Sequence, residues 1–497
     1  MRSALLRLHL SDNVAVSLIS LDAGTEVSID GRSLLVQQNV PVGHKIALAD
    51  LCVGAQVVKY GQPIGQATQA VAAGSWVHSH NMRTNLAGAV EYRYQPVAAS
   101  TQAISAGRTF GGYRRSNGAV GTRNEVWVLN TVGCVNRSAA RIARICSEQF
   151  GARIDGVHTF AHPYGCSQSG DDLEHTRRIL AGLIGHPNAG GVLLLGLGCE
   201  DNQVDSLLQV AGDIDRARVR YFNSQDVDDE VEHGVAVVAE LVSSMQRDRR
   251  AEYPIADLVV GLKCGGSDGL SGVTANPLVG RITDRITAHG GGAILTEVPE
   301  IFGAEQTLLN RAASEGLFRE MERLVNDFKQ YYLTHGRPIY ENPSPGNIAG
   351  GLTTLEEKAL GAIRKGGSAT VTEVLRYGER KRTSGLSLLE APGNDGISAT
   401  ALVAAGATVL LFTTGRGTPM GSPVPTIKIS SNTAVYERKP RWIDFNAGAV
   451  QDGSAEVDEL EAGLFDLLLD VASGRLRTNN ERYDYRDIAI WKTGVTL

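Results

Sequence analysis

Four short apolar segments, each followed by a cysteine next to a glycine, constrain the fold of this chain more than any other feature. They are rich in β-branched residues and Leu, which is typical of strands covered on both faces, as in a parallel sheet. Intervals of 32, 33 and 65 residues between the cysteines leave room for helical crossovers. We therefore predict an α/β fold whose body is a doubly wound, Rossmann-like, mostly parallel sheet. The cysteines are Cys134, Cys166, Cys199 and Cys264.

These four cysteines are candidate metal ligands. A single one would more simply be a small buried apolar residue, but all four follow strands, and ligands collect at the carboxyl ends of parallel strands. We therefore expect the four thiols to converge on one crevice. His162 and Glu200 lie beside them in the sequence and offer nitrogen and oxygen ligands. Cys52 and Cys146 are expected to take no part, because the first lies in a small β module and the second inside an amphipathic helix.

Composition excludes several classes of function. A net charge of −6 and the lack of a basic cluster with interleaved aromatic residues argue against a nucleic-acid partner. No apolar stretch approaches the roughly 18 residues that a membrane span needs, and the first residues lack the apolar core of a signal peptide. We expect a cytoplasmic enzyme with no membrane partner, in which the cysteines stay reduced.

The hydrophobic pattern divides the chain into four parts. Residues 1–95 contain short alternating segments separated by turns, which predicts a small all-β module. A polar linker at 96–107 leads to a middle α/β domain at 108–250 and a C-terminal α/β domain at 251–497. Because the linker lacks apolar anchors, we expect the module to change position with ligand state.

Motifs over nearly the whole length of the chain indicate a family. In the β module they are Pro41-Val42-Gly43-His44-Lys45, residues 59–65 and Val77-His78-Ser79-His80-Asn81; in the middle they are residues 121–124, 131–136 and 196–200; in the C-terminal part they are residues 263–269, 274–277, 297–300, 342–347, 413–417 and 425–428. With these the chain resembles the altronate/galactarate dehydratase family, whose N-terminal module is a β-clip of the SAF type. Residues 81–86, 92–96, 162–168 and 492–497 are similar to the altronate branch of that family.

The resemblance implies an activity, a cofactor and an assembly. It implies dehydration of D-altronate to 2-dehydro-3-deoxy-D-gluconate in hexuronate breakdown, with ferrous iron (Fe2+) required and a homodimer expected. The iron is either a mononuclear ion on three of the candidate ligands or a four-iron cluster held by three cysteines, and the sequence does not separate the two. A closed zinc site is disfavoured, because no ligands occur in close C-x-x-C pairs.

Three other functions stay open as alternatives. They are a galactarate dehydratase, a sulfo-lyase of the same family and a non-catalytic protein that binds sugar acids. The resemblance implies that in the sulfo-lyases the β module and the α/β body lie on separate chains, so their fusion here argues against a sulfo-lyase. Four cysteines at strand ends, with His162 and Glu200, argue against a mere binding protein.

Dehydration of a sugar acid needs a base for the proton next to the carboxylate, an electrophile for the enediolate and help for the departing hydroxide. A divalent metal supplies the last two. His78 and His80 would point to the same side of an extended strand, which suits a base carried over the metal by the β module. The alternative is that both histidines only pack the module and that His162 is the base.

Polar side chains near glycines are candidate substrate ligands. Arg123, Arg416 and Lys428 are expected to bind the carboxylate or hydroxyl groups, with Arg123 and Lys428 also counted as catalytic candidates. Asp268, Ser271 and Asn276 lie in a glycine-rich loop that suits a polyhydroxylated substrate. That loop carries no phosphate-binding motif, so no nucleotide cofactor is implied.

Two glutamates, Glu297 and Glu300, follow the predicted strand at 293–295. Paired carboxylates at the carboxyl end of a strand bind a hard cation or protonate a leaving hydroxyl group. Equally, the two side chains would form a buried hydrogen-bonded pair that caps the next helix.

Overall fold

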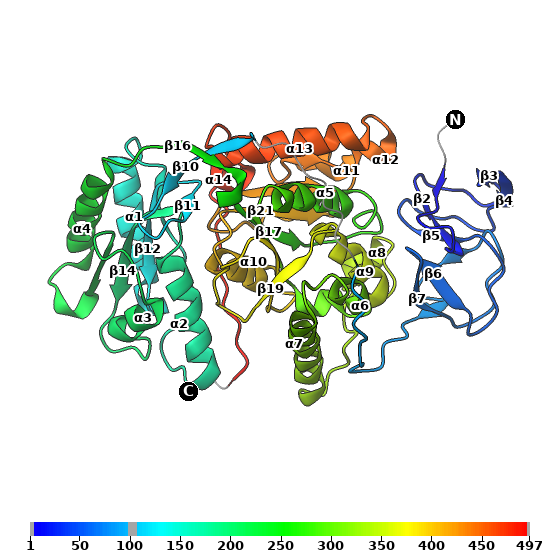
Figure 1. Cartoon of the computed structure of the whole chain (residues 1–497), viewed down its shortest axis with the longest axis horizontal. Coiled ribbons are helices and arrows are strands. Elements are labelled where there is room, and N and C mark those ends of the chain that lie inside the picture. Colours follow the sequence, from blue (N-terminus) through cyan, green and yellow to red (C-terminus); the bar gives the residue numbers. More distant parts are fainter. Residues whose placement is uncertain (1–3, 98–106, 495–497) are drawn as a thin grey trace.

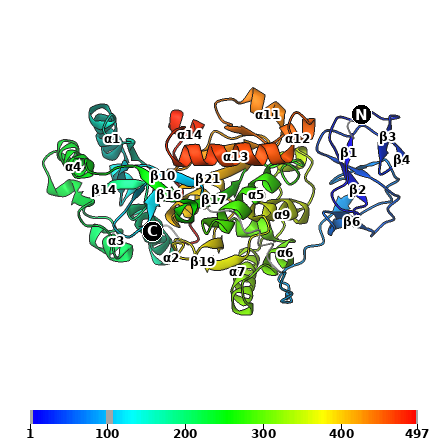
Figure 2. The ribbon, with the colours of Figure 1, turned by 45° about the horizontal axis from the view of Figure 1, so that its top comes forward.

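The structure is a computed structural model that describes residues 4–97 and 107–494. A β module lies at one end, a C-terminal α/β domain in the centre and a middle α/β domain at the other end (Figures 1 and 2). Most of the predicted linker, residues 98–106, falls outside the described residues. No helix in the described part of the chain has both the length and the apolar character needed to cross a membrane.

The β module consists of short antiparallel strands, as predicted. Two-residue turns explain its hairpins: Asp30-Gly31 and Tyr60-Gly61 have positive φ angles between 51° and 75°, as hairpin turns require. Its sheets contain β1 (Leu5–Leu6), β2 (Val14–Ser17), β5 (Lys45–Ala47) and β8 (Trp76–Val77); β3 (Glu26–Ile29) and β4 (Arg32–Leu35); and β6 (Gln56–Lys59), β7 (Gln62–Ala67) and β9 (Met82–Arg83).

The chain after β9 packs against the C-terminal domain. Tyr94 packs on Phe318 with ring centroids 5.3 Å apart, Lys329 Nζ donates to Tyr92 Oη over 2.8 Å, and Val97 N donates to Asn310 O over 2.9 Å. The last strand of the module therefore ends at Arg83, and residues 84–97 run along the C-terminal domain.

The middle domain has a four-stranded parallel sheet in the order β13-β12-β14-β15. Alternate residues of β12 explain its two faces: Val126 and Val128 pack against α1 and α4, whereas Trp127 and Leu129 pack against α2 and α3. The elements are β12 (Glu125–Asn130), α1 (Asn136–Phe150), β13 (Gly156–Thr159), α2 (Gly170–Ile184), β14 (Ala189–Gly196), α3 (Val204–Ala211), β15 (Val219–Asn223) and α4 (Glu230–Met245).

The C-terminal domain has a seven-stranded parallel sheet in the order β19-β20-β18-β17-β21-β22-β23. Helices α5 and α13 cover one face and α10 the other (Figure 1), and α10 also shares a core with α2 of the middle domain. The sheet contains β17 (Val259–Cys264), β18 (Gly292–Leu295), β19 (Val371–Leu375), β20 (Gly385–Leu389), β21 (Val409–Thr414), β22 (Thr426–Ser430) and β23 (Phe445–Asn446), and the helices are α5 (Ala275–Ala288), α10 (Asp395–Ala404) and α13 (Val457–Ala472). This confirms the predicted doubly wound, mostly parallel body.

Strand β17 is where the chain reverses its direction across the seven-stranded sheet, because β18 lies on one side of it and β21 on the other. In open α/β sheets such a switch point opens a crevice at the carboxyl ends of the strands. Further helices border this edge: α6 (Glu305–Leu309), α7 (Glu315–Thr334), α8 (Pro345–Ala349) and α9 (Leu355–Ala362). Three short helices lie further along the domain: α11 (Thr433–Arg438), α12 (Ala449–Asp452) and α14 (Asn479–Arg482).

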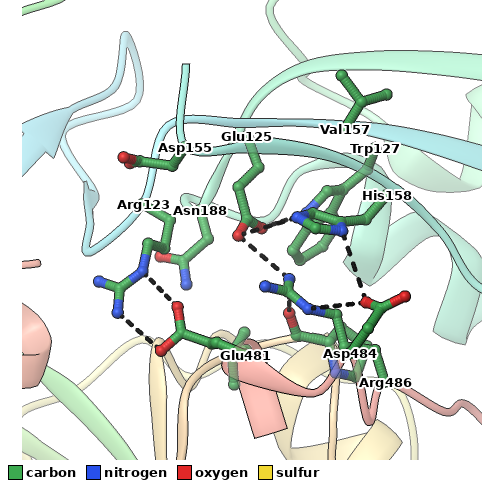
Figure 3. Close-up of polar contacts among 12 residues, drawn as sticks. Arg123, Glu125, Trp127, Asp155, Val157, His158, Asn188, Glu481, Asp484 and Arg486 are labelled. Atoms are coloured by element: carbon green, nitrogen blue, oxygen red, sulfur yellow. Dashed lines mark hydrogen bonds and ion pairs between the residues drawn. The ribbon is translucent and has the colours of Figure 1, made fainter. Parts of the chain in front are cut away.

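The two α/β domains are joined in two places. A small sheet of β10 (Thr109–Arg114), β11 (Val120–Gly121) and β16 (Ala251–Pro254) lies between them. The last segment of the chain then returns to the middle domain, where Arg486 Nη1 donates to Glu125 Oε1 over 3.1 Å (Figure 3). Arg123 forms a two-pronged ion pair with Glu481 in the same contact, over 2.7 and 3.0 Å.

A buried charge triad fixes the β module to the C-terminal domain. Lys45 Nζ and Lys59 Nζ lie 2.8 and 2.7 Å from the carboxylate of Glu357 in α9, and all three side chains are at most 1% exposed. Although burial favours the neutral form of Glu357, the two ammonium groups hold its pKa below its usual range. The triad therefore holds the module on the C-terminal domain in this structure. The change of module position with ligand state stays a prediction.

We predict that Glu357→Gln loosens the β module. The change leaves two buried ammonium groups without a counter-charge, which costs about 3–5 kcal/mol when one partner of a buried pair is removed. Limited proteolysis should release the module from the variant faster than from the wild type, and thermal unfolding should begin earlier. Glu437→Gln on the exposed face of α11 is the matched control, and equal cleavage rates for both variants would contradict the clamp.

Candidate active site

A thiol and two carboxylates meet at the carboxyl end of β17. Cys264 Sγ lies 3.2 Å from Glu300 Oε2 and 3.6 Å from Glu297 Oε2. Glu297 has the left-handed φ of 69°, so the chain turns sharply after β18 and directs both glutamates inward. In the described parts of the chain this is the only group of three metal-ligating side chains whose donor atoms lie within 4.8 Å of one another.

Three buried lysines surround this group. Lys365 Nζ lies 2.7 Å from Cys264 Sγ, and Lys358 Nζ lies 2.7 Å from Glu300 Oε1. Lys263 contacts Glu297 and also lies 2.6 Å from Asp395 Oδ1, at the start of α10. Three ammonium groups thus face three carboxylates, and we call these six residues together with Cys264 the lysine–carboxylate cluster.

The charges in the cluster push the pKa values of its members apart. Burial opposes ionisation of Glu300, but the ammonium group of Lys358 and its neighbours lower its pKa to about 2. Burial and the adjacent Glu300 instead raise the pKa of Glu297. Burial, together with the two glutamates, raises the pKa of the Cys264 thiol to about 12. Carboxyl groups with separated pKa values, next to charged amines, are typical of catalytic sites.

Asparagines and Asp395 form the rim of the cluster. Lys358 Nζ donates to Asn342 Oδ1 over 3.0 Å and to Asn347 Oδ1 over 3.3 Å. Asp395 is the most exposed carboxylate of the cluster, at 38% of its side chain, whereas Glu297 and Glu300 are buried. Asn342 and Asp395, both partly exposed, therefore connect the buried cluster with the surface.

The glycine-rich loop after β17 is held by its own polar residues. Asp268 Oδ1 accepts hydrogen bonds from Ser271 N and Ser431 Oγ, both over 2.8 Å. Asn276 donates to Gly361 O over 3.0 Å and accepts from Thr413 Oγ1 over 2.6 Å. Asp268, Ser271 and Asn276, which the sequence suggested as substrate ligands, are thus occupied in shaping the loop.

Of the three predicted cationic ligands, only Arg416 lies near the cluster. It is exposed, its backbone N donates to Gly266 O over 3.0 Å, and its side chain has no polar partner among the described residues. Lys428 Nζ instead donates to Thr418 O over 2.7 Å, and burial lowers its pKa to about 8. Arg123 lies at the amino end of β12 in its ion pair with Glu481, so neither of these two faces the cluster.

The histidines of the β module border α8. His78 Nε2 lies 3.0 Å from Ile348 O, and its ring stacks on His44 with centroids 5.2 Å apart. Residues 78–81 form a turn rather than the extended strand assumed from the sequence. The rings of His78 and His80 are nevertheless only 6.4 Å apart, because both pack on Trp76. His78 therefore docks the module, whereas the ring of His80 is exposed.

The predicted convergence of four thiols is wrong, because the strands belong to two sheets. Cys134, Cys166 and Cys199 are exposed on loops of the middle domain, whereas Cys264 is buried in the C-terminal sheet. Cys146 is buried in α1 and Cys52 lies in the β module, away from either set.

His162 and Glu200 hold the loops that carry the exposed thiols. His162 Nε2 lies 2.9 Å from Asn130 O, and its Nδ1 accepts from Tyr164 N over 3.2 Å. Glu200 accepts from Leu197 N over 3.0 Å and from Gly198 N over 2.7 Å. Both side chains are buried in the middle domain, where their polar atoms hold the loops. Neither is therefore placed as a base or a ligand at the lysine–carboxylate cluster of the C-terminal domain.

Sequence reasoning missed most of the cluster. Lys263 adjoins Cys264, and the motif at 342–347 contains both rim asparagines, so these signals were available. Nothing in the sequence marked Lys358 and Lys365 as site residues, because a lysine in a helical pattern is usually exposed to solvent.

Comparison with known proteins covers the whole chain. Family models match residues 3–85 (altronate/galactarate dehydratase SAF domain), 112–246 (D-galactarate dehydratase/altronate hydrolase, second domain) and 255–496 (D-galactarate/altronate dehydratase, C-terminal). The chain is 51% identical to altronate dehydratase of Escherichia coli (strain K12) and 48% identical to that of Bacillus subtilis (strain 168), each over 494 residues and 99% of both chains. It is 34% identical to galactarate dehydratase (L-threo-forming) of Escherichia coli (strain K12), over 96% of this chain and 94% of that one.

We predict that the thiols differ sharply in reactivity. Only the thiolate reacts with an alkylating agent, and Cys264 is both 1% exposed and held in the thiol form by its surroundings. In reduced, metal-free protein at neutral pH, iodoacetamide should modify Cys134, Cys166 and Cys199 but reach Cys264 only after denaturation, as mass spectrometry would show. Cys52 and Cys146 serve as exposed and buried references. Rapid labelling of Cys264 in the folded protein would contradict the described cluster.

Proposed function

This chain belongs to the altronate/galactarate dehydratase family, and we propose that it is a hydro-lyase that converts D-altronate to 2-dehydro-3-deoxy-D-gluconate and water. The observation that carries the substrate is the identity of 48–51% to two altronate dehydratases over 99% of the chain. The lysine–carboxylate cluster supports the reaction type. Its amines, carboxylates and thiol lie at the switch point of the larger sheet, where α/β enzymes bind ligands.

Lys358 is placed to assist the departing hydroxide. Its ammonium group is held by Glu300, Asn342 and Asn347 and is kept charged by the ionised Glu300. A fixed ammonium group beside the C3 hydroxyl of the substrate gives its proton to the leaving oxygen. Lys263 and Lys365 add positive charge where the enediolate develops, which lowers the barrier by preorganised electrostatics.

Two exposed residues outside the cluster, Arg416 and His80, are the candidates for orienting the substrate and abstracting its proton. The free guanidinium of Arg416 suits a two-pronged hydrogen bond to the substrate carboxylate. His80 is our candidate for the base that takes the C2 proton. Its ring lies on the module face next to His78, which contacts Ile348 in α8, and the neighbouring Asn347 reaches Lys358.

The family resemblance implies ferrous iron, and the donor set of the cluster fits a divalent ion. Cys264, Glu297 and Glu300 offer one sulfur and two carboxylate ligands within 4.8 Å of one another. We propose these three residues as the ligands, with the thiol losing its proton on binding. When bound, the ion would supply a Lewis acid for the substrate oxygens. The cytoplasmic location and the homodimer expected from the sequence stay predictions.

The substrate is tested with a panel of sugar acids. The full chain, reduced and supplied with ferrous iron without air, should form a 2-keto-3-deoxy product from D-altronate with a kcat/KM at least about 100-fold above that for D-galactarate. Preference for galactarate, or release of sulfite from a sulfonated hydroxy acid, would overturn the assignment to D-altronate. Turnover of none of these compounds would overturn the proposed enzyme altogether.

We predict that Lys358→Met lowers kcat by about 10²–10⁴-fold, the range typical for loss of a general acid. Lys358→Arg keeps the charge that compensates Glu300, so it should fold like the wild type and still lose most of the activity. Circular dichroism and thermal unfolding of both variants separate a catalytic loss from misfolding. If Lys358→Arg is folded and fully active, the proton-donor role of Lys358 is wrong.

The base is tested with His80→Gln. The variant should lose exchange of the C2 proton of D-altronate with deuterium from solvent, measured by NMR, because abstraction of that proton is the step assigned to the ring. His9→Gln, in another exposed turn of the module, is the control. Unchanged exchange in His80→Gln would move the base role to another residue.

A further inference from the structure

A cavity of about 390 Å³ lies at the amino edge of the seven-stranded sheet, where the C-terminal domain meets the middle domain. It is lined by Val259 and Gly292, the first residues of β17 and β18, and by Pro187 of the middle domain. Cys264 and the lysine–carboxylate cluster lie at the opposite, carboxyl end of β17. The cavity is therefore separate from the candidate active site, and its volume falls in the range of about 300–1,000 Å³ that is typical of small-molecule sites.

Three consecutive cationic residues line this cavity. Arg380, Lys381 and Arg382 lie in the loop between β19 and β20. In the described part of this loop the ion pairs with carboxylates are formed by Arg376 instead, which does not line the cavity. Burial lowers the pKa of Arg380, as expected for a guanidinium group without a nearby counter-charge. The cavity thus gathers positive charge that the loop itself does not neutralise.

The nearest carboxylates are occupied by other partners. Asp257 is the one acidic side chain among the described residues that line the cavity, and it pairs with Arg114 over 2.7 Å. Glu373 on β19 accepts a hydrogen bond from Ser387 Oγ over 3.0 Å. Burial lowers the pKa of Lys381 to about 8, although Glu373 acts in the opposite direction. The positive charge of the cavity is therefore left for a ligand to balance.

Contacts with both domains hold the cationic side chains in place. Arg380 Nη2 donates to Gly185 O, directly after α2 of the middle domain, over 2.6 Å. Lys381 N donates to Ala405 O, directly after α10, over 3.0 Å. Gly292 leaves room for the Lys381 side chain, because a Cβ atom there would lie 2.5 Å from Lys381 Cε. Cationic groups fixed in this way lose little freedom when they bind an anion.

We propose that this cavity binds a small molecule that carries two negative charges, as a phosphate group or a pair of carboxylates, and that this ligand bridges the two α/β domains. Arg and Lys side chains recognise such groups through charge-assisted hydrogen bonds. Ser384 and Asn117 also line the cavity and offer neutral polar groups, and Asn117 lies in the turn between β10 and β11. The site does not depend on the proposed dehydration.

The test is titration calorimetry of the full chain with a phosphorylated sugar acid, 6-phospho-D-gluconate, and separately with inorganic phosphate and succinate. We expect saturable binding of 6-phospho-D-gluconate and a higher temperature of thermal unfolding, because a ligand of the folded chain stabilises it. Lys381→Met and Arg382→Gln should each weaken this binding by about tenfold or more, as expected for loss of one charge-assisted hydrogen bond. Arg382 is exposed, so its variant should fold like the wild type.

Two control variants locate the bound anion. Arg376→Gln removes a cation from the same loop outside the cavity, and Arg416→Gln removes one beside the candidate active site; both should bind 6-phospho-D-gluconate like the wild type.

Each other result has a distinct meaning. Binding of succinate alone, weakened by Lys381→Met and Arg382→Gln, would support the site and identify carboxylates as its ligand groups. No saturable binding of any of the three anions would overturn the site. Binding that neither variant weakens, or that only Arg416→Gln weakens, would overturn it as well. Normal binding in a chain inactive on D-altronate would contradict the proposed function and support this inference.

Discussion

The balance of charge inside the C-terminal domain is the constraint on which the rest of the structure depends. Lys263, Lys358 and Lys365 are buried against Glu297, Glu300 and Asp395, and a buried charge is tolerated only when it is paired and hydrogen-bonded. Removal of one partner of a buried ion pair is strongly destabilising, so the cluster fixes strand β17 with Lys263, the turn at Glu297, and the helical segment 355–366 with Lys358 and Lys365. The same charges create the field that a dehydration of a sugar acid needs.

Helix α9 carries this constraint to the β module. Three consecutive residues of the helix serve different neighbours: Glu356 accepts from Thr84 Oγ1 over 2.8 Å, Glu357 pairs with Lys45 and Lys59, and Lys358 enters the lysine–carboxylate cluster. The module is thus docked by the residue adjacent to a catalytic candidate. Glu357 and Lys358 are consecutive residues of α9, so the contact that docks the module and the contact that enters the cluster share one turn of helix.

The sequence predicted the elements better than their assembly. Apolar runs such as 192–195 indicate parallel strands, and the short alternating segments of residues 1–95 indicate a small β module, because these signals are local. Four cysteines with the same local context nevertheless split between two sheets, since a pattern around one strand does not say which sheet it joins. Glu297 and Glu300 were found because they follow a recognisable strand. Lys358 and Lys365 were not, because only the tertiary arrangement of acidic groups makes a buried lysine stable.

We propose that dehydration takes place at the lysine–carboxylate cluster rather than at the edge of the middle domain that carries Cys134, Cys166 and Cys199. A crystal structure of the chain with D-altronate bound tests it most directly. We expect the substrate carboxylate within hydrogen-bond distance of Arg416 and the C3 hydroxyl facing Lys358, with Asn342 and Asp395 beside the sugar chain. Electron density for D-altronate beside Cys134, Cys166 and Cys199, with nothing at the cluster, would contradict it.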